Sequence, residues 1–343
     1  MGNLWSNLRY SPYAGRTVTL RNGRSGSPAP AGRRPARSVP EEFADFTGYH
    51  REMDSSRRIF LATLGGAPAL AQTARREPKL AYRTLGMTGL KVTTLGFGTM
   101  LASDPLVVER AADMGITCFD SARSYQGGNN ERMVGAALKG KRQRVVLASK
   151  TLAATREGAL RDLDTSLREI GTDYLDLWYM HAKGRPEEVT DELLEAQQAA
   201  KKAGKIRFAG VSTHANMKGL LAWLVEKRLT DVILTSYNFY LSEDISGAIR
   251  AARKAGVGIV AMKVMAGGYA RIRRGDRLYG QHPNTLLGRL EKPGAMLAAL
   301  KWAVRNESVD TAIVGITDFD ELEENTRAMA EPFREADASL LGL

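Results

Sequence analysis

Residues 144–181 read RVVLASKTLAATREGALRDLDTSLREIGTDYLDLWYMH and contain one complete repeat of the fold. The two ends, RVVLASK and DYLDLWYMH, are short apolar runs of the kind that form buried strands. Between them, residues 156–170 carry apolar side chains at helical spacing, and Gly171 follows where a helix often ends. A strand, a helix and a second strand in succession predict parallel strands joined by a right-handed crossover.

The same alternation runs through the rest of the chain. Further strands are expected to begin at residues 93, 117, 206, 231, 258 and 311. Helices are expected near residues 105–115, 130–139, 189–203, 216–228, 243–255, 295–306 and 318–329. Eight such units predict an α/β fold, a (β/α)8 TIM barrel. A doubly wound open sheet is the alternative, but it needs a GxGxxG loop after its first strand, and GFGTM at residues 96–100 does not provide one.

Two segments are expected to close the ends of this barrel. LAYRTLGMTGLKVT, residues 80–93, places Gly86 and Gly89 between two short alternating runs, which indicates an N-terminal capping β-hairpin. The long connection over residues 266–293, after the seventh strand, is expected to overhang the C-terminal mouth.

Composition excludes several classes of protein. The 343 residues include 43% apolar residues and one cysteine, Cys118, so a disulfide framework is excluded. Four histidines and one cysteine leave no cluster with metal-ligand spacing, and no metal site is expected. No apolar run approaches the roughly 18 residues of a membrane span, which excludes a polytopic membrane protein.

The net charge of +11 lies mostly outside the predicted barrel. Residues 1–76 hold 12 Arg, no Lys and 5 acidic residues, whereas the remaining residues carry a net charge of only +4. The basic residues near the N-terminus sit in a Pro/Gly/Ser/Arg stretch with little apolar content, not on a folded face. No nucleic-acid partner is expected.

The segment from Met53, MDSSRRIFLATLGGAPALAQ, has the shape of a secretory signal peptide. Residues 56–61 resemble the twin-arginine export motif S-R-R-x-F-L, which implies the Tat translocon as a partner and a periplasmic location. An apolar run of about 12 residues is too short for a stable membrane anchor. The alternative is an N-terminal amphipathic helix with an incidental arginine pair, which would leave the protein cytoplasmic.

Three regions follow from this interpretation. Residues 53–76 are a signal peptide, residues 77–343 form the barrel, and residues 1–52 are either a disordered leader or an upstream segment that is not translated. Translation from Met53 is our hypothesis, because the Arg-only basic composition of residues 1–52 resembles translated non-coding DNA. A genuine long leader is the rival.

Four ionisable residues are predicted to meet at the barrel mouth. Asp120, Lys150 and His181 each end a predicted strand, and Tyr125 lies in the loop after Asp120. The pKa of a tyrosine is about 10, and a neighbouring ammonium lowers it. A buried carboxylate would keep that ammonium charged. The set therefore predicts an acid–base site in which Asp120 holds Lys150, Lys150 tunes Tyr125, and His181 bonds the same substrate oxygen.

Five segments resemble, in order and spacing, the aldo-keto reductase superfamily over about residues 80–330. They are DSARSYQGGNNERMVG, VVLASK, DYLDLWYMH, GVSTHAN and TAIVGITDFDELEEN. The resemblance implies a (β/α)8 barrel enzyme that binds NADPH or NADH across its mouth and reduces a small aldehyde or ketone to an alcohol. It also implies that Tyr125 is the proton donor, that Lys150 and Asp120 are its tuning pair, and that His181 orients the carbonyl.

The same resemblance implies a set of cofactor-binding positions: Ser212, Tyr237, Lys263, Gly267, Gly315, Glu324 and Asn325. Ser212 would bond the carboxamide and Tyr237 would stack on nicotinamide. Lys263 and Gly267 belong to an MKVMAGG word that resembles a bacterial branch with MKPLGGG, and Gly267 would lie beside the pyrophosphate. Glu324 and Asn325 would lie near the adenine.

One departure bears on the choice of nucleotide. Family members that prefer NADPH commonly carry a basic residue four positions before the Asn, and this chain has Glu321 there. Acidic residues repel a 2′-phosphate, so the sequence predicts NADH preference or dual use. The competing interpretation is that these acids only favour the dipole of the last helix.

Two other functions are compatible with the fold. A Schiff-base aldolase would use Lys150 as its nucleophile, but this leaves Tyr125 and Asp120 unexplained. A non-enzymatic nucleotide-binding partner subunit is the second alternative, and the intact set of four residues argues against it. The sequence does not identify the substrate.

Overall fold

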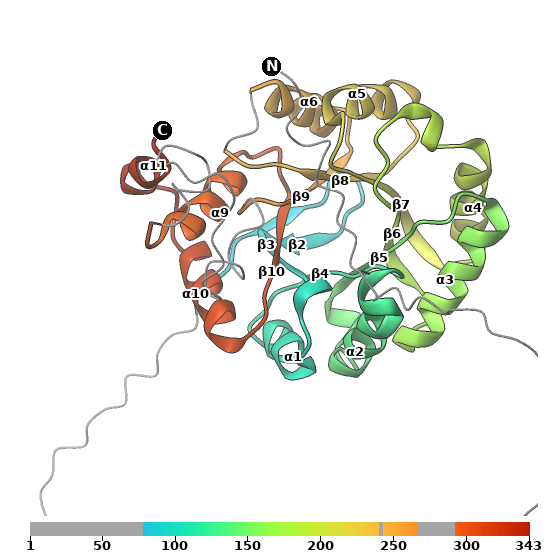
Figure 1. Ribbon diagram of the computed structural model, residues 1–343, viewed down its shortest axis with the longest axis horizontal. Coiled ribbons are helices and arrows are strands. Elements are labelled where there is room, and N and C mark those ends of the chain that lie inside the picture. The colour runs from blue at the N-terminus through green and yellow to red at the C-terminus, as the bar shows by residue number, and fades with distance from the viewer. Residues whose placement is uncertain (1–77, 240–242, 266–291) are drawn as a thin grey trace, which may run out of the picture. The chain divides into compact units, whose positions relative to one another are not determined.

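The computed structural model describes residues 78–239, 243–265 and 292–343. Eight strands close into a barrel in the order β10-β3-β4-β5-β6-β7-β8-β9, and every neighbouring pair is parallel. Helices surround the ring of strands (Figure 1). The predicted (β/α)8 barrel is confirmed. The barrel belongs to a unit that spans Arg76–Leu343.

The barrel strands match the predicted runs and are shorter than most of them. They are β3 (Leu95–Gly98), β4 (Cys118–Asp120), β5 (Val146–Thr151), β6 (Leu175–Met180), β7 (Ile206–Thr213), β8 (Val232–Ser236), β9 (Gly258–Met262) and β10 (Thr311–Gly315). Among the described residues, four short 3-10 helices lie in the loops: η1 (Thr99–Leu101), η2 (Tyr125–Gly128), η3 (Arg142–Arg144) and η4 (Pro186–Glu188).

Each predicted helix has a counterpart. The helices are α1 (Pro105–Asp113), α2 (Asn129–Ala137), α3 (Arg156–Ile170), α4 (Asp191–Lys202), α5 (Met217–Lys227), α6 (Glu243–Lys254), α9 (Ala295–Arg305) and α10 (Phe319–Met329). Local signals fix their ends: the Thr155 side chain accepts a hydrogen bond from Gly158 N at the start of α3, and Gly171 ends it at φ 74°. A further short helix, α11 (Glu335–Leu341), packs on α9 and was not predicted.

The hairpin β1 (Tyr82–Thr84) and β2 (Lys91–Thr93) closes the N-terminal end of the barrel, as predicted. Leu85, Leu90 and Val92 from this hairpin share one apolar cluster with inward-facing residues of the barrel strands. At its turn, Gly86 has φ +52°, and a Cβ there would lie 2.3 Å from Gly258 N, so the turn needs glycine. A larger cluster fills the space between the strands and the helices.

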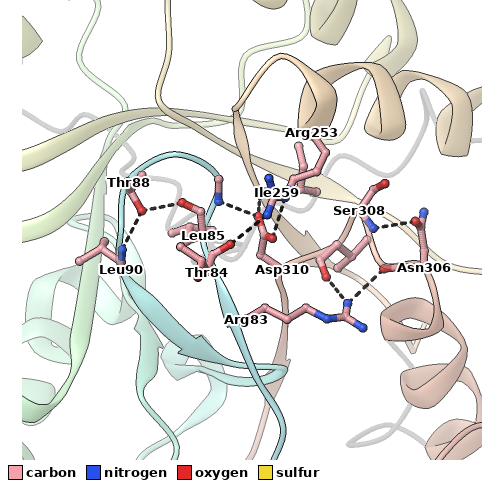
Figure 2. A network of polar contacts seen from close by, with 12 residues as sticks. Arg83, Thr84, Leu85, Thr88, Leu90, Arg253, Ile259, Asn306, Ser308 and Asp310 are labelled. Atoms are coloured by element: carbon pink, nitrogen blue, oxygen red, sulfur yellow. Dashed lines mark hydrogen bonds and ion pairs between the residues drawn. The ribbon is translucent and has the colours of Figure 1, made fainter.

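A polar network ties the hairpin to the barrel (Figure 2). Asp310, just before β10, is fully buried, and its Oδ2 accepts hydrogen bonds from Gly86 N at 3.1 Å and Ile259 N at 2.9 Å. Its Oδ1 accepts one from Arg253 Nε at 2.9 Å. Arg83 donates to backbone carbonyls at the end of α9, including that of Val304 at 2.8 Å. Hydrogen bonds from both oxygens of Asp310 and from Arg83 therefore fasten the hairpin to this end of the barrel.

None of the helices in the described ranges has both the length and the apolarity needed to cross a bilayer.

Candidate active site

Three of the four predicted catalytic side chains meet at one nitrogen. Lys150 Nζ donates to Asp120 Oδ2 at 2.6 Å, to the Ser121 carbonyl at 2.7 Å and to the Tyr125 hydroxyl at 3.1 Å. The lysine ammonium therefore has three oxygen partners, and one of them is the phenol. Asp120 and Lys150 are both buried.

Strand alternation explains this meeting. Val146 and Ala148 on β5 point into the barrel, so Lys150, two residues further, does the same. Asp120 is paired in register with Ala148 and also points inward. Because the carboxyl ends of parallel strands open at one face, both side chains reach the same mouth.

His181 lies beside the phenol, directly after β6. Its ring centroid is 5.9 Å from that of Tyr125, and the planes meet at 78°. The backbone N–H of His181 donates to the Thr151 carbonyl at 2.9 Å, which fixes its place next to β5. Its buried Nδ1 has no hydrogen-bond partner among the described residues. The structure thus brings all four predicted residues together.

The predicted cofactor residues on β7, β9 and β10 lie at the same end of the barrel. Ser212 is buried near the end of β7, and its Oγ accepts a hydrogen bond from Ala182 N at 2.8 Å. Lys263 follows β9 with φ 54°, and its carbonyl accepts from Asn238 Nδ2 at 3.1 Å. Gly315 ends β10. Gly267 lies outside the described residues.

The first turns of α10 hold the remaining predicted cofactor residues. Asn325 is buried, and its Oδ1 has no partner in the described part of the chain. Glu324 is exposed. Glu321 is buried, and its Oε2 accepts hydrogen bonds from Thr317 N at 2.8 Å and Thr317 Oγ1 at 2.9 Å. A carboxylate therefore lies where the predicted NADPH-preferring pattern would have a cation.

Tyr237 does not lie where a nicotinamide-stacking ring was predicted. Its ring packs on Trp302 of α9, with centroids 5.0 Å apart, and its hydroxyl bonds Ser246 Oγ at 3.0 Å and Asn306 Nδ2 at 3.1 Å. These partners belong to the outer helices. Leu234 points into the barrel, so alternation turns residue 237 outward. The family resemblance placed the Tyr237 ring on the inner side of the barrel, which is wrong. The alternation of inward and outward side chains along the strand would have placed it on the outer side.

Comparison with known proteins agrees with this geometry. A model of the aldo/keto reductase family matches residues 94–341. The chain belongs to the aldo/keto reductase family.

Similar relatives span most of its length. L-galactose dehydrogenase of Arabidopsis thaliana is 25% identical over 284 residues, which cover 74% of this chain and 89% of that protein. L-glyceraldehyde 3-phosphate reductase of Escherichia coli O157:H7 is 27% identical over 310 residues, with the same two shares. The solved holo form of aldo-keto reductase AKR11C1 from Bacillus halodurans is 25% identical, with a TM-score of 0.66 over 77% of this chain and 96% of that one.

Burial and charge set the protonation states in this aldo/keto reductase. Burial alone lowers the pKa of Lys150, but the Asp120 carboxylate and Tyr125 more than offset it, so the pKa lies above its usual value. Burial, reinforced by nearby Lys150, His214 and Lys183, lowers the pKa of His181 to about 3. At neutral pH the site therefore contains an ammonium and a neutral imidazole.

The pKa of Tyr125 corrects one prediction. Burial raises this pKa above the ordinary value for tyrosine, and the Lys150 ammonium pulls it down only in part. The lysine charge by itself lowers this pKa, and burial outweighs that effect. In this structure, Lys150 limits the rise in the tyrosine pKa and does not make the phenol more acidic than a free one.

Sequence reasoning did not single out Arg123 and Glu131, which form a partly buried ion pair behind the Tyr125 loop. An acidic residue in the first turn of a helix usually serves the helix dipole. Only the full burial of Glu131 marks it as different, and no pattern in a single sequence gives that burial.

Metal-binding clusters are a separate question. Among the described residues, no group of three or more His, Cys, Asp or Glu residues is placed to hold a metal ion.

Proposed function

We propose that this protein is an NAD(P)H-dependent carbonyl reductase in which Tyr125 is the proton donor. The observation that carries the proposal is the position of Lys150 Nζ, 2.6 Å from Asp120 Oδ2 and 3.1 Å from the Tyr125 hydroxyl. A tyrosine that donates its proton leaves a phenolate behind, and this ammonium lies where it would stabilise that anion.

The residues at the mouth fit a dinucleotide. Asn325 Oδ1 is a buried acceptor without a partner among the described residues, and burial lowers the pKa of Lys263, whose ammonium has no ion-pair partner there. Ser212, Lys263, Gly315, Glu324 and Asn325 would hold the nucleotide. When bound, the reduced nicotinamide supplies a hydride to the carbonyl carbon of the substrate.

The side chains of this chain complete the reduction. The Tyr125 hydroxyl transfers its proton to the carbonyl oxygen as the carbon is reduced, and an alcohol results. Neutral His181 donates a hydrogen bond to the same oxygen and so orients the carbonyl. Asp120 keeps Lys150 protonated through both steps, because burial alone would favour the neutral amine.

An aldolase mechanism has less support. A Schiff-base lysine must attack as a neutral amine, usually with a lowered pKa. The ion pair with Asp120 raises the pKa of Lys150 instead. The site therefore favours Lys150 as a fixed cation.

The test is nucleotide oxidation by the purified protein with a panel of small aldehydes and ketones. L-galactose and L-glyceraldehyde 3-phosphate belong in the panel because they appear in the names of relatives. We expect carbonyl-dependent oxidation that falls by about a hundredfold to ten thousandfold in Tyr125→Phe. Tyr237→Phe is the matched tyrosine control and should retain turnover. Full turnover by Tyr125→Phe would overturn the proposal.

We also propose NADH preference or dual use of NADH and NADPH. The support is Glu321, whose buried carboxylate already accepts two hydrogen bonds from Thr317. A 2′-phosphate close to this carboxylate would be repelled. Dissociation constants measured by nucleotide fluorescence test the point, and NADPH bound a hundredfold more tightly than NADH would contradict it.

Export by the Tat translocon to the periplasm remains part of the proposal, as does translation from Met53. Both rest on residues 1–77, outside the described ranges. Fractionation of the native host, followed by mass spectrometry of the mature N-terminus, tests both. A peptide from residues 1–52 would contradict the start at Met53, and recovery of the whole protein from cytoplasm would contradict export.

A further inference from the structure

A partly buried ion pair lies behind the loop that carries Tyr125. Arg123, two residues before the tyrosine, donates through Nη1 to Glu131 Oε2 in the first turn of α2. The side chain of Glu131 is 0% exposed and that of Arg123 is 17% exposed. A charged pair with so little solvent gives a strong, directional contact.

The second carboxylate oxygen of Glu131 reaches the strand that carries Lys150. Ser149 Oγ donates to Glu131 Oε1 at 2.6 Å, and Ser149 immediately precedes Lys150 on β5. The backbone adds a parallel link, because Arg123 N donates to the Lys150 carbonyl at 3.1 Å. One carboxylate therefore connects the chain segments of both the phenol and the ammonium.

The Tyr125 loop needs such outside support. Gln126, Gly127 and Gly128 all have positive φ, and the left-handed conformation is unfavourable for a non-glycine residue such as Gln126. The Arg123 guanidinium lies against Gly128, where a Cβ would be only 1.7 Å from Nη2. Gln126 Nε2 holds the outer side of the loop by donating to the Ala102 carbonyl at 2.8 Å. The ion pair is the charged anchor of this loop.

We propose that Glu131 is a positioning residue that sets the distance between the Tyr125 hydroxyl and Lys150 Nζ. It acts through Arg123 on the loop and through Ser149 on β5. The role rests on the proposed function, since the distance matters for reduction only if Tyr125 donates the proton. Lysine and tyrosine held at 3.1 Å share a strong electrostatic interaction that weakens as they separate.

Other charged groups act on Tyr125 and on Arg123. The pKa of Tyr125 responds to the charges of Lys150 and Asp120, and the His181 ring lies against the edge of the tyrosine ring. Arg123 bonds Glu131 and also lies within electrostatic reach of Glu169 on α3. Glu169 is bonded to Arg132 at 2.6 Å. Removing the charge of Glu131 thus leaves the Arg123 guanidinium near a second acid, and only the backbone hydrogen bond from Arg123 N to the Lys150 carbonyl then ties this residue to β5.

The test is Glu131→Gln, which keeps the shape of the side chain and removes its charge. We expect kcat to fall about tenfold, with KM for the carbonyl and Kd for the nucleotide within about twofold. The pKa of Tyr125, read from phenolate absorbance against a Tyr125→Phe baseline, should rise by about half a unit or more because Lys150 moves away. Ser149→Ala, which removes one hydrogen bond, should shift both readouts in the same direction by less.

Asp310→Asn is the matched control, a buried acid in an ion pair at the far end of the barrel. It should lower stability and leave both kcat and the tyrosine titration unchanged. If Glu131→Gln behaves like this control, Glu131 is only structural and the proposal fails. If Glu131→Gln does not fold, wild-type kcat and titration in Ser149→Ala would overturn the proposal. The titration needs no turnover, so it still decides the role of Glu131 if Tyr125→Phe shows the proposed function to be wrong.

Discussion

Two buried aspartates at opposite ends of the barrel differ in how completely they are bonded. At the hairpin end, Asp310 uses both carboxylate oxygens, which accept from Arg253 and from two backbone N–H groups. At the mouth, Asp120 uses only Oδ2, which accepts from Lys150, and its buried Oδ1 has no partner among the described residues. Each aspartate is paired with one cation, but only Asp310 has hydrogen-bond partners on both carboxylate oxygens.

The difference separates a carboxylate that holds backbone segments together from one that lies in the proposed acid–base site. Asp310 joins the hairpin turn, β9 and α6, so its partners fix backbone positions. The partner of Asp120 is a lysine that also donates a hydrogen bond to a phenol, so under the proposed function the Asp120 charge would control a proton. Stability at the closed end and chemistry at the open end is the division expected of a TIM barrel.

The largest effect is expected from Asp120→Asn. Without the carboxylate, the buried Lys150 loses the group that keeps it charged, and Tyr125 loses its stabilising cation. We expect kcat for carbonyl reduction to fall by about a hundredfold to ten thousandfold. Steady-state kinetics beside Asp310→Asn checks the comparison, since the control should stay within about twofold of wild type.

Asp310→Asn should show the opposite behaviour, a loss of stability without a loss of chemistry. An amide cannot accept from both backbone N–H groups and also pair with Arg253, so the free energy of unfolding should fall by about 3 kcal/mol. Urea denaturation followed by circular dichroism measures the change. An unaltered unfolding midpoint would mean that the saturated carboxylate is not the structural one.

The pH dependence of stability should reveal His181. The folded protein keeps this imidazole neutral, with a pKa of about 3, whereas the unfolded chain binds a proton below its ordinary pKa of 6.5. The contribution of His181 to stability is therefore complete above pH 6.5. It falls as the pH drops toward 3, by at most about 1.4 kcal/mol per pH unit. Denaturation curves of wild type and His181→Asn between these limits should converge toward acid, and parallel curves would contradict the assignment.

The smallest effect is expected from Tyr237→Phe. The variant removes the hydrogen bonds to Ser246 and Asn306 and keeps the ring on Trp302. We expect a loss of about 1 kcal/mol in unfolding free energy with unchanged kcat. In a double-mutant cycle with Asn306→Ala, the double variant should lose less unfolding free energy than the sum of the losses in the two single variants. Strict additivity would show that the hydroxyl does not act through Asn306.

The fold was predictable because its signal is repeated. Eight alternations of strand and helix leave few other closed arrangements, and caps such as Thr155 and Gly171 mark helix ends locally. The meeting of Asp120, Lys150 and His181 at the barrel mouth was predictable for a related reason. Polar residues that end apolar strands stand out, and a parallel barrel brings all strand ends together.

What sequence reasoning missed depends on distances and burial. The pKa of Tyr125 depends on how deeply the loop buries the ring, and the ion pair of Arg123 with Glu131 depends on three left-handed residues between them. The stacking role of Tyr237 was assigned from the two-residue motif Tyr-Asn and not from the alternation of side chains along the strand. A resemblance transfers residue types more reliably than side-chain directions.

The most direct test of the central claim is the pKa of Tyr125 in Lys150→Met, read from phenolate absorbance with Tyr125→Phe as the baseline. If the Lys150 ammonium keeps the pKa of Tyr125 low enough for this phenol to donate its proton, removal of the ammonium should raise that pKa by at least about one unit, because burial and Asp120 then act unopposed. A pKa that stays the same or falls would contradict the claim that Lys150 tunes this tyrosine.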